Sequence, residues 1–312
     1  MSTTETVAAP PIPASMRASD WSLLLFLSLL WGFSYFFTAV ALKGGLPPVT
    51  LVLLRTALAA LVLLPLVPLL GYAMPRDWAT WKLFAVQSIL NNVVPFTLMA
   101  WAQTQITSGL AAVLNATTPL WTLLVAWVLV GERLSFNKTI GVLFGIAGVA
   151  TLIGPELAIV NVPSLLGMGA FLLGTLFYGF SALWMRRLRH IPPIVSAASQ
   201  LCWSSVLLLP IAASIDSFWL LPLPAPGVIG AVIGVAVFST ALAYIVFFRI
   251  SASAGPQNAM LVTLLIPVTA TLLGVVFLAE ALTVHQVVGA IVIAMGLLVT
   301  DGRLLSYLPG RR

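Results

Sequence analysis

Apolar segments long enough to cross a lipid bilayer follow one another along almost the whole chain. A transmembrane helix needs about 20 mostly apolar residues, and Gly, Pro or charged residues separate the stretches of roughly this length. The third and fourth stretches count as two because we interpret Gln103 to Ser108 as a tight turn. The pattern predicts an all-α integral membrane protein with ten transmembrane helices, at about 21–42, 49–71, 79–103, 107–130, 137–154, 164–185, 193–214, 225–248, 256–279 and 284–301.

The composition excludes a water-soluble fold. Charged residues make up 7% of the 312 residues and hydrophobic residues 61%, whereas about 25% of an ordinary globular chain is charged. A soluble enzyme, a nucleic-acid-binding module and a disordered protein are therefore excluded. Lys and Arg number 14 against 8 Asp and Glu, and membrane topology explains this excess better than a nucleic-acid partner does.

The basic residues outside the segments fall almost entirely on one side of the predicted bundle. Lys43 is the exception, in a loop on the other side. Because Lys and Arg collect in cytoplasmic loops, we predict that both termini are cytoplasmic. Residues 1–20 are rich in Ala, Pro, Ser and Thr, which predicts a disordered cytoplasmic tail. The basic residues on the predicted cytoplasmic side are Arg17, Arg76, Lys82, Arg133, Lys138, Arg186, Arg187, Arg189, Arg249, Arg303, Arg311 and Arg312.

The chain contains an internal repeat. Near the start of each half, Gly32-Phe33-Ser34 and Gly179-Phe180-Ser181 match at a shift of 147 residues. Further along, a shift of 148 residues superposes a longer ordered set. Its matched pairs are Pro119 with Pro267, Glu132 with Glu280, Leu134 with Leu282, Gly141 with Gly289, and Gly148 with Gly296.

Each repeat holds five predicted spans, over 21–156 and 164–303. Because five is an odd number, the second repeat must enter the membrane from the opposite side and is therefore inverted. The loops agree, since 131–138 holds two basic residues and the matching 279–286 holds none. Inverted repeats are an architecture of secondary transporters, which hold the substrate near the midplane between the repeats.

Several motifs carry a resemblance to a known family. Trp31-Gly32-x-Ser34 in the first span, Arg55 in the second and the repeated Pro…Glu-x-Leu…Gly pattern resemble the drug/metabolite transporter superfamily, in particular its EamA-type ten-helix members. Among these the chain is most similar to the YddG-like amino-acid exporters. The second half departs from the first, because Tyr178-Gly179 replaces the Trp-Gly pair and no Arg matches Arg55.

The resemblance implies a multi-pass transporter of the bacterial cytoplasmic (inner) membrane. It would export neutral or aromatic amino acids and related small metabolites by alternating access. We expect no enzymatic activity, no cofactor, no metal and no nucleic-acid partner. The expected partners are the small-molecule substrate and the lipid bilayer, with the protein a monomer or a weak homodimer.

The resemblance also implies that spans 1, 3, 4, 6, 8 and 9 surround a central substrate cavity. Amides and hydroxyls on its wall would suit the charged ends of an amino acid, and ring faces its side chain. Alternatively, the amides join helix to helix and the aromatic residues lie at the membrane interfaces. The residues expected at the cavity are Trp31, Tyr35, Asn91, Asn92, Trp101, Asn115, Tyr178, Trp184, Tyr244 and Asn258.

Arg55 is the basic residue expected inside a span, where a charged side chain is costly. It could pair with a substrate carboxylate or act in a gate. It could also extend to the outer surface or bind a neighbouring carbonyl, and its place about six residues into the segment favours this second interpretation.

Pro95, Pro119 and Pro267 remove backbone donors in mid-span and predict either gating segments or fixed kinks. Glu132 and Glu280 lie at matching span ends, where helix capping or pairing with Arg133 is favoured over proton coupling. The glycines at 141, 145 and 148 allow close helix approach, and we expect it within the protein rather than between two copies.

Other functions remain as alternatives. An exporter of apolar organic cations or drugs, driven by protons, would use aromatic walls equally well. An intramembrane enzyme has weak support, because Ser239 and Thr240 have no His or Asp nearby in the sequence. A channel is the third alternative. The lack of a basic cluster in the spans argues against sugar phosphates and nucleotide sugars as substrates.

Overall fold

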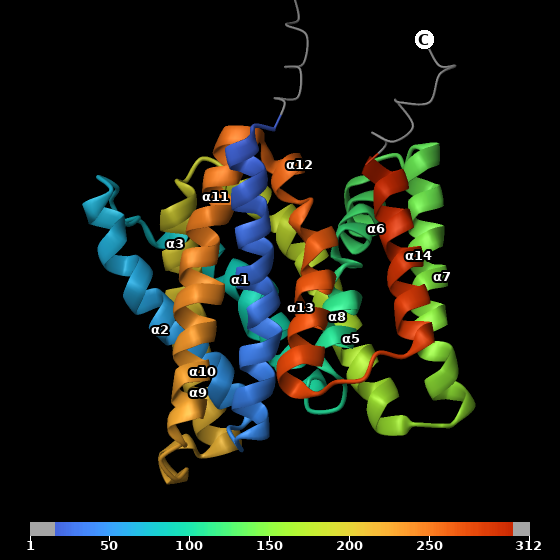
Figure 1. The fold of residues 1–312 in the computed structure, drawn as a ribbon. Coiled ribbons are helices and arrows are strands. Elements are labelled where there is room, and N and C mark those ends of the chain that lie inside the picture. Colours follow the sequence, from blue (N-terminus) through green and yellow to red (C-terminus); the bar gives the residue numbers. More distant parts are fainter. Residues whose placement is uncertain (1–15, 302–312) are drawn as a thin grey trace, which may run out of the picture.

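A computed structural model describes residues 16–301, with the backbone alone at 256, 257 and 301. The helices run up and down a single bundle (Figure 1). Residues 1–15 of the predicted tail, together with Arg303, Arg311 and Arg312, lie outside the described residues. The first helix already begins at Ala18, so the last residues of the predicted tail are helical.

The chain forms the helices that the apolar pattern predicts. Eight helical stretches between Ala18 and Ala254 are long and apolar enough to cross a membrane, and two shorter apolar helices follow. All ten coincide with the predicted segments. The elements of the first half are α1 (Ala18–Lys43), α2 (Pro48–Leu69), α3 (Trp78–Ser88), η1 (Ile89–Val93), α4 (Val94–Ala102), α5 (Ser108–Asn115), α6 (Thr118–Val130) and α7 (Phe136–Ala158).

The second half follows the same plan. Among the described residues the chain is helical throughout and forms no strand. The elements are α8 (Val162–Met185), η2 (Arg186–Leu188), α9 (Pro193–Asp216), η3 (Phe218–Leu220), α10 (Pro226–Ile233), η4 (Gly234–Leu242), α11 (Ala243–Ala254), α12 (Pro256–Ala259), α13 (Val262–Leu278) and α14 (Val284–Asp301).

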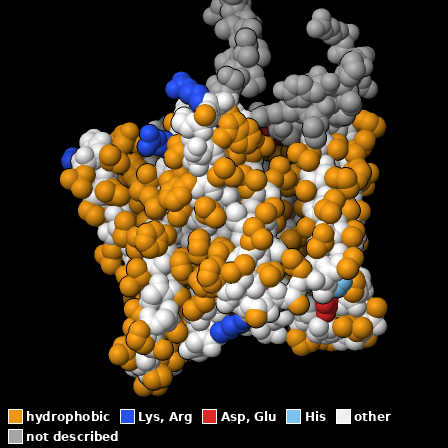
Figure 2. Space-filling view, viewed as in Figure 1, with side chains coloured by type: hydrophobic (Ala, Val, Ile, Leu, Met, Phe, Trp, Pro, Cys, Tyr) orange, Lys and Arg blue, Asp and Glu red, His pale blue; other side chains and the backbone are white. Residues whose placement is uncertain are grey.

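The start of α1 and the end of α14 lie at the same end of the bundle (Figure 1). We call this the terminal end, and we call the opposite end, which holds Lys43, Asp216 and Glu280, the far end. Figure 2 shows hydrophobic side chains over the middle of the bundle and Lys or Arg side chains toward its two ends. This distribution is the one a bilayer requires, since charged groups avoid its apolar centre.

Two of the spans contain a π-helical segment at the same repeat position. In the third span η1 precedes Pro95, and the backbone N–H of Val94 bonds to the carbonyl of Ile89, five residues earlier. In the eighth span, η4 covers Gly234–Leu242, and a shift of 148 residues carries η1 into it. Such wider turns often occur at functional sites.

The fourth and ninth spans are each broken into two helices. Span 4 breaks between α5 and α6, and Pro119 lies in the first turn of α6. Span 9 breaks between α12 and α13, whereas Pro267 lies inside α13. The two prolines match in the repeat, but only Pro119 lies at a break.

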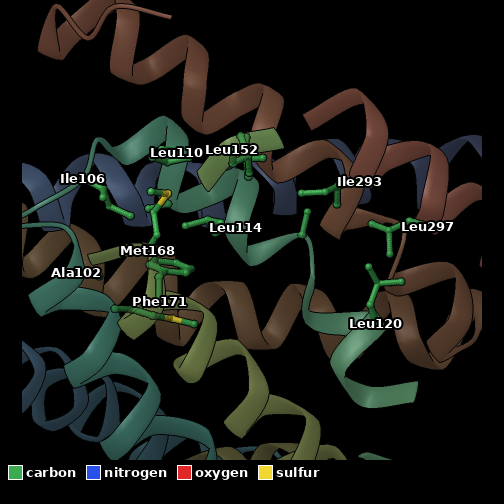
Figure 3. Packing of buried hydrophobic residues seen from close by; sticks show 14 of the residues in the cluster. Ala102, Ile106, Leu110, Leu114, Leu120, Leu152, Met168, Phe171, Ile293 and Leu297 are labelled. Atoms are coloured by element: carbon green, nitrogen blue, oxygen red, sulfur yellow. The ribbon is translucent and has the colours of Figure 1, made fainter. Parts of the chain in front are cut away.

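A hydrophobic cluster joins the two halves beside the break in span 4. Its buried side chains come from α4 to α7 and the turn after α4 in the first half, and from α8 and α14 in the second (Figure 3). Burial of these side chains fixes α5 and α6 against the second repeat. The cluster includes Ala102, Ile106, Leu110, Leu114, Leu120, Leu152, Met168, Phe171, Ile293 and Leu297.

The helices α7 and α14 lie side by side (Figure 1) and touch through the repeated glycines. A Cβ atom at Gly141 would lie 2.6 Å from the carbonyl oxygen of Gly296, and one at Gly148 would lie 3.0 Å from that of Gly289. Gly141 therefore faces Gly296, the repeat counterpart of Gly148, and Gly148 faces Gly289, the repeat counterpart of Gly141. The expected glycine packing within the protein is confirmed.

We expect Gly148→Ala to destabilise the protein, because the added methyl group would meet Ile293 and the Gly289 backbone of α14. Overpacking of this kind typically costs about 1–3 kcal/mol, which lowers the midpoint of thermal unfolding in detergent. The control is Gly154→Ala on the same helix, where the methyl group would meet no atom within 4 Å. Equal unfolding midpoints for the two variants would contradict the packing described.

Candidate functional site

A cavity of about 520 Å³ lies among helices of both halves. At the terminal end its wall reaches the surface at Arg189 and Met260, which are exposed. Toward the far end the wall residues Thr38, Leu51 and Ala100 are buried. The cavity is therefore open at the terminal end and closed at the far end.

Two carboxylates close the far end by joining the halves. Glu280 accepts hydrogen bonds from the backbone N–H of Ser108 at 2.9 Å, from its hydroxyl at 2.8 Å and from the backbone N–H of Gly109 at 3.1 Å. Asp216 accepts from the backbone N–H and the hydroxyl of Thr50, both at 2.7 Å. Carboxylates are favourable at helix N-termini, so α5 and α2 of the first half are capped by the second.

The capping role expected for Glu280 is therefore confirmed, although the helix it caps belongs to the other repeat. Its counterpart Glu132 lies at the terminal end and bonds to Arg186 Nη1 at 2.6 Å, with both side chains about half exposed. This hydrogen bond holds the pKa of the Glu132 carboxyl below its usual value. The expected partner, Arg133, is not the one the structure shows.

Arg55 points into the cavity rather than to the outer surface. Its Nε donates to the hydroxyl of Thr240 at 2.9 Å, and its guanidinium carbon lies 3.9 Å from the ring centre of Phe96. The interpretation favoured by its place in the sequence, that it extends to the outer surface, is wrong. The Thr240 hydroxyl on η4 and the Phe96 ring on α4 hold the guanidinium inside the bundle.

Two of the three guanidinium nitrogens of Arg55 form no hydrogen bond with the described residues. The described residues offer neither Nη1 nor Nη2 a hydrogen-bond partner, while Nε is engaged by Thr240. Tyr35, Tyr178 and Tyr244 line the same cavity as this guanidinium. The Nη1 and Nη2 atoms of Arg55 therefore present N–H groups of fixed orientation to the cavity.

Amides and hydroxyls form a connected network on the same wall. Gln87 Nε2 donates to Ser181 Oγ at 2.8 Å, and that hydroxyl donates to Asn91 Oδ1 at 2.9 Å. Asn91 Nδ2 in turn lies 3.0 Å from Gln200 Oε1 and 3.3 Å from Tyr244 Oη. The network joins helices of both halves, so Asn91 has the interhelical role as well as a place at the cavity.

Three buried polar atoms of wall residues have no partner among the described residues. They are the amide oxygens of Gln87 and Gln103 and the hydroxyl of Ser239. Buried polar atoms are normally hydrogen-bonded. These atoms are available to a bound molecule.

Aromatic rings form the apolar part of the wall. Trp31 and Phe247 lie with their ring centres 5.5 Å apart, and Tyr244 stacks on Phe248 at 5.8 Å. All four residues line the cavity. The wall thus combines two guanidinium groups, several amides and an aromatic surface, which suits a small amphipathic molecule.

The structure brings six of the ten expected cavity residues to the wall. The repeated Gly-Phe-Ser motif also contributes, since Ser34 and Ser181 both line the cavity, although neither was expected there. The helices α2 and α9 take part as well, through Arg55 and Gln200, in addition to the spans that the resemblance implies. The six expected residues at the wall are Trp31, Tyr35, Asn91, Asn115, Tyr178 and Tyr244.

Two of the expected asparagines lie away from the wall. Asn92 is fully buried and donates to the hydroxyl of Ser204 at 2.9 Å. Neighbouring residues of a helix point about 100° apart, and here Asn91 lines the cavity while Asn92 points to Ser204. Asn258 is buried and its Nδ2 donates to the carbonyl of Ala254 at 2.6 Å.

Two of the expected tryptophans also lie away from the wall. Trp101 is 39% exposed on the outside of the bundle. Trp184 donates from its indole nitrogen to the carbonyl of Leu83 at 3.0 Å, and the guanidinium of Arg187 lies over its ring. Both positions fit the aromatic residues that face lipid or the membrane interface.

Comparison with known proteins gives the family. The model of the EamA-like transporter family matches residues 21–154 and again residues 165–300. The chain belongs to this family. The family model thus occurs twice along the chain, in agreement with the internal repeat.

Relatives with similar sequences cover most of the chain. The uncharacterized transporter YvbV of Bacillus subtilis (strain 168) is 28% identical, over 87% of this chain and 88% of its own. The uncharacterized inner membrane transporter YedA of Escherichia coli (strain K12) is 26% identical over 90% of both chains. Both names describe a transporter, that of YedA an inner membrane transporter, and neither name states a substrate.

A solved crystal structure of another protein shows the same fold. It is 21% identical, covers 94% of this chain and 99% of its own, and has a TM-score of 0.65. At this identity the likeness concerns the fold alone.

We expect loss of the Glu280 contact to open the far end. Glu280→Ala removes the acceptor of the hydrogen bonds from Ser108 and Gly109. A cysteine placed at the wall residue Ser34, in a Cys202→Ala background, should then react several-fold faster with an impermeant thiol reagent added at the far end.

The matched control for this experiment is Glu132→Ala. Glu132 is the repeat counterpart of Glu280 and makes its ion pair at the other end of the bundle. It should leave the labelling rate from the far end unchanged. Equal rates in both variants would show that Glu280 does not hold this end closed.

Proposed function

We propose that this EamA-family protein is a secondary transporter that exports neutral or aromatic amino acids and related small metabolites across the cytoplasmic membrane by alternating access. One observation carries the proposal. A cavity between the two repeats, open at one end, combines the guanidinium of Arg55 with amides and aromatic rings. These groups match a carboxylate, further polar groups and an apolar side chain.

The internal geometry supports inverted repeats. Each repeat has five spans, and the contact between α7 and α14 is reciprocal, with Gly141 on Gly296 and Gly148 on Gly289. A pseudo-twofold axis between these antiparallel helices exchanges the halves. We propose the first repeat over 21–156 and the second over 164–303, as in other transporters built from inverted repeats.

We propose that the terminal end is cytoplasmic. Among the described residues, the basic residues at the ends of the spans and in the loops lie there, apart from Lys43, and such residues favour the cytoplasmic side. The cavity would then face the cytoplasm, ready to load a substrate for export. The π-helical segment beside Pro95 and the break beside Pro119 are the segments where we expect gating motion, whereas Pro267 lies inside the intact helix α13.

The alternative of a cation exporter has less support. Among the described residues, the cavity wall holds Arg55 and Arg189 and no Asp or Glu. A positive wall repels organic cations. It also lacks a carboxylate that could carry a coupling proton, so we propose transport driven by the substrate gradient.

Flux in proteoliposomes tests the proposed function. A labelled panel of neutral, aromatic and charged amino acids, with one quaternary ammonium cation, should be followed with and without a pH gradient. We expect saturable exchange of amino acids or their relatives that does not depend on the gradient. Flux of the cation alone, or flux only under the gradient, would support proton-coupled drug export instead.

We expect Asn91→Ala to lower the flux at least severalfold, because Asn91 joins the amide network on the cavity wall. Trp101→Ala is the control, since Trp101 lies on the outside of the bundle and its loss should leave flux unchanged. Both fluxes are measured at equal amounts of folded protein. A lower flux in Trp101→Ala with normal flux in Asn91→Ala would remove this wall from the transport path.

A further inference from the structure

We infer that the favoured substrate is a monoanion, with one carboxylate, an apolar or aromatic body and no ammonium group. N-acylated and deaminated relatives of amino acids have this chemistry. The inference rests on the proposed function, because it takes the cavity as the transport site. It narrows the substrate class to molecules whose negative charge would neutralise the positive charge of Arg55 inside the bundle.

Arg55 has no acidic partner among the described residues of the cavity wall. Its positive charge lies inside the bundle, and no acidic residue among those described lines the cavity with it. The acids near the far end are engaged elsewhere, Asp216 by Thr50, Glu280 by Ser108 and Glu156 by Asn161. Burying a charge without a partner is costly in a membrane, so a ligand that brings one negative charge is favoured.

The acids at the terminal end do not neutralise Arg55 either. Glu132 pairs with Arg186, and Asp20 accepts from the backbone of Arg17 and the hydroxyl of Ser253. A monoanion would bring the pair formed with Arg55 to zero net charge. A zwitterionic amino acid would leave one positive charge in the cavity.

The orientation of Arg55 suits a carboxylate. The bond from Nε to Thr240 and the ring of Phe96 fix the plane of the guanidinium. The Nη1 and Nη2 atoms remain, and two parallel bonds to a carboxylate are the strongest contact that arginine forms with an anion. Holding this geometry before binding reduces the entropy lost on binding.

An ammonium group finds no anionic partner on the described wall, where contact with the other aromatic rings is what remains for it. The described wall offers no carboxylate, and the ring of Phe96 already faces Arg55. The unpartnered atoms are the amide oxygens of Gln87 and Gln103 and the Ser239 hydroxyl, which are neutral. They suit a neutral donor such as an amide N–H or a hydroxyl better than a cation that has lost its water.

Charge at the mouth of the cavity acts in the same direction. Arg189 is exposed and lies on the wall, so a substrate passes one guanidinium at the mouth and a second inside. Clefts lined by charge of one sign raise the local concentration of oppositely charged ligands. The path as a whole therefore selects anions.

Three probes with the same phenyl ring separate the possibilities. They are 3-phenylpropanoate, which is an anion, phenylalanine, which is a zwitterion, and 2-phenylethylamine, which is a cation. Their uptake is measured with the full chain in proteoliposomes at constant membrane potential, after subtraction of protein-free vesicles. We expect uptake of the anion to exceed that of phenylalanine at least tenfold, with an inward movement of negative charge.

Variants of Arg55 test its part in this selection. Arg55→Gln should reduce the preference for 3-phenylpropanoate over phenylalanine at least tenfold, and Arg55→Lys should restore part of it. Arg187→Gln is the control, because Arg187 lies over Trp184, which does not line the cavity. If Arg55→Gln abolishes all flux, binding is measured instead. The rise in the thermal unfolding midpoint that each probe causes, in the wild type and in the variant, then gives the preference for 3-phenylpropanoate over phenylalanine.

Each outcome decides between the two proposals. Phenylalanine transported faster than 3-phenylpropanoate would overturn the monoanion and leave amino-acid export standing. A preference that Arg55→Gln does not change would overturn the assignment to this residue. Transport of 2-phenylethylamine alone, or of none of the probes by folded protein, would overturn both the monoanion and the proposed function.

Discussion

The bilayer satisfies no backbone hydrogen bonds, and this constraint determines where the helices of this protein can bend. Irregular backbone at membrane depth is tolerated where it is buried in protein or lines a cavity. Here η1, η4 and the break between α5 and α6 all contribute residues to one cavity or lie beside it, including Asn91, Asn115 and Ser239. The same departures from regular helix supply the polar wall.

The charged side chains are also placed as the apolar interior of the bilayer requires. The carboxylates at the ends of the bundle cap helices or form an ion pair with exposed side chains, as at Glu280 and Glu132. Arg55 remains as a charge inside the bundle, held by a hydroxyl and a ring. The ends therefore hold the two halves together, while the interior retains an unpaired positive group for binding.

Much of the fold can be predicted from the sequence, because lipid imposes long apolar segments and the duplication marks matching positions. The contact of α7 with α14 follows from glycine spacing. The direction of Arg55 does not, since it depends on Thr240, 185 residues away. Apolar periodicity also fails to separate Asn91 from Asn92, or Trp101 from Trp31, because lipid and cavity both accept aromatic residues.

The π-helical segments occupy matching positions in the two halves, so the wider turn dates from the single unit that was duplicated. Under the shift of 148 residues, Asn91 and Asn92 fall on Ser239 and Thr240. Two matching positions thus hold amides in one copy, where Asn91 alone lines the cavity, and hydroxyls in the other, where both Ser239 and Thr240 line it. The duplication gave this cavity two faces that could diverge independently, so a symmetric scaffold came to enclose an asymmetric binding site.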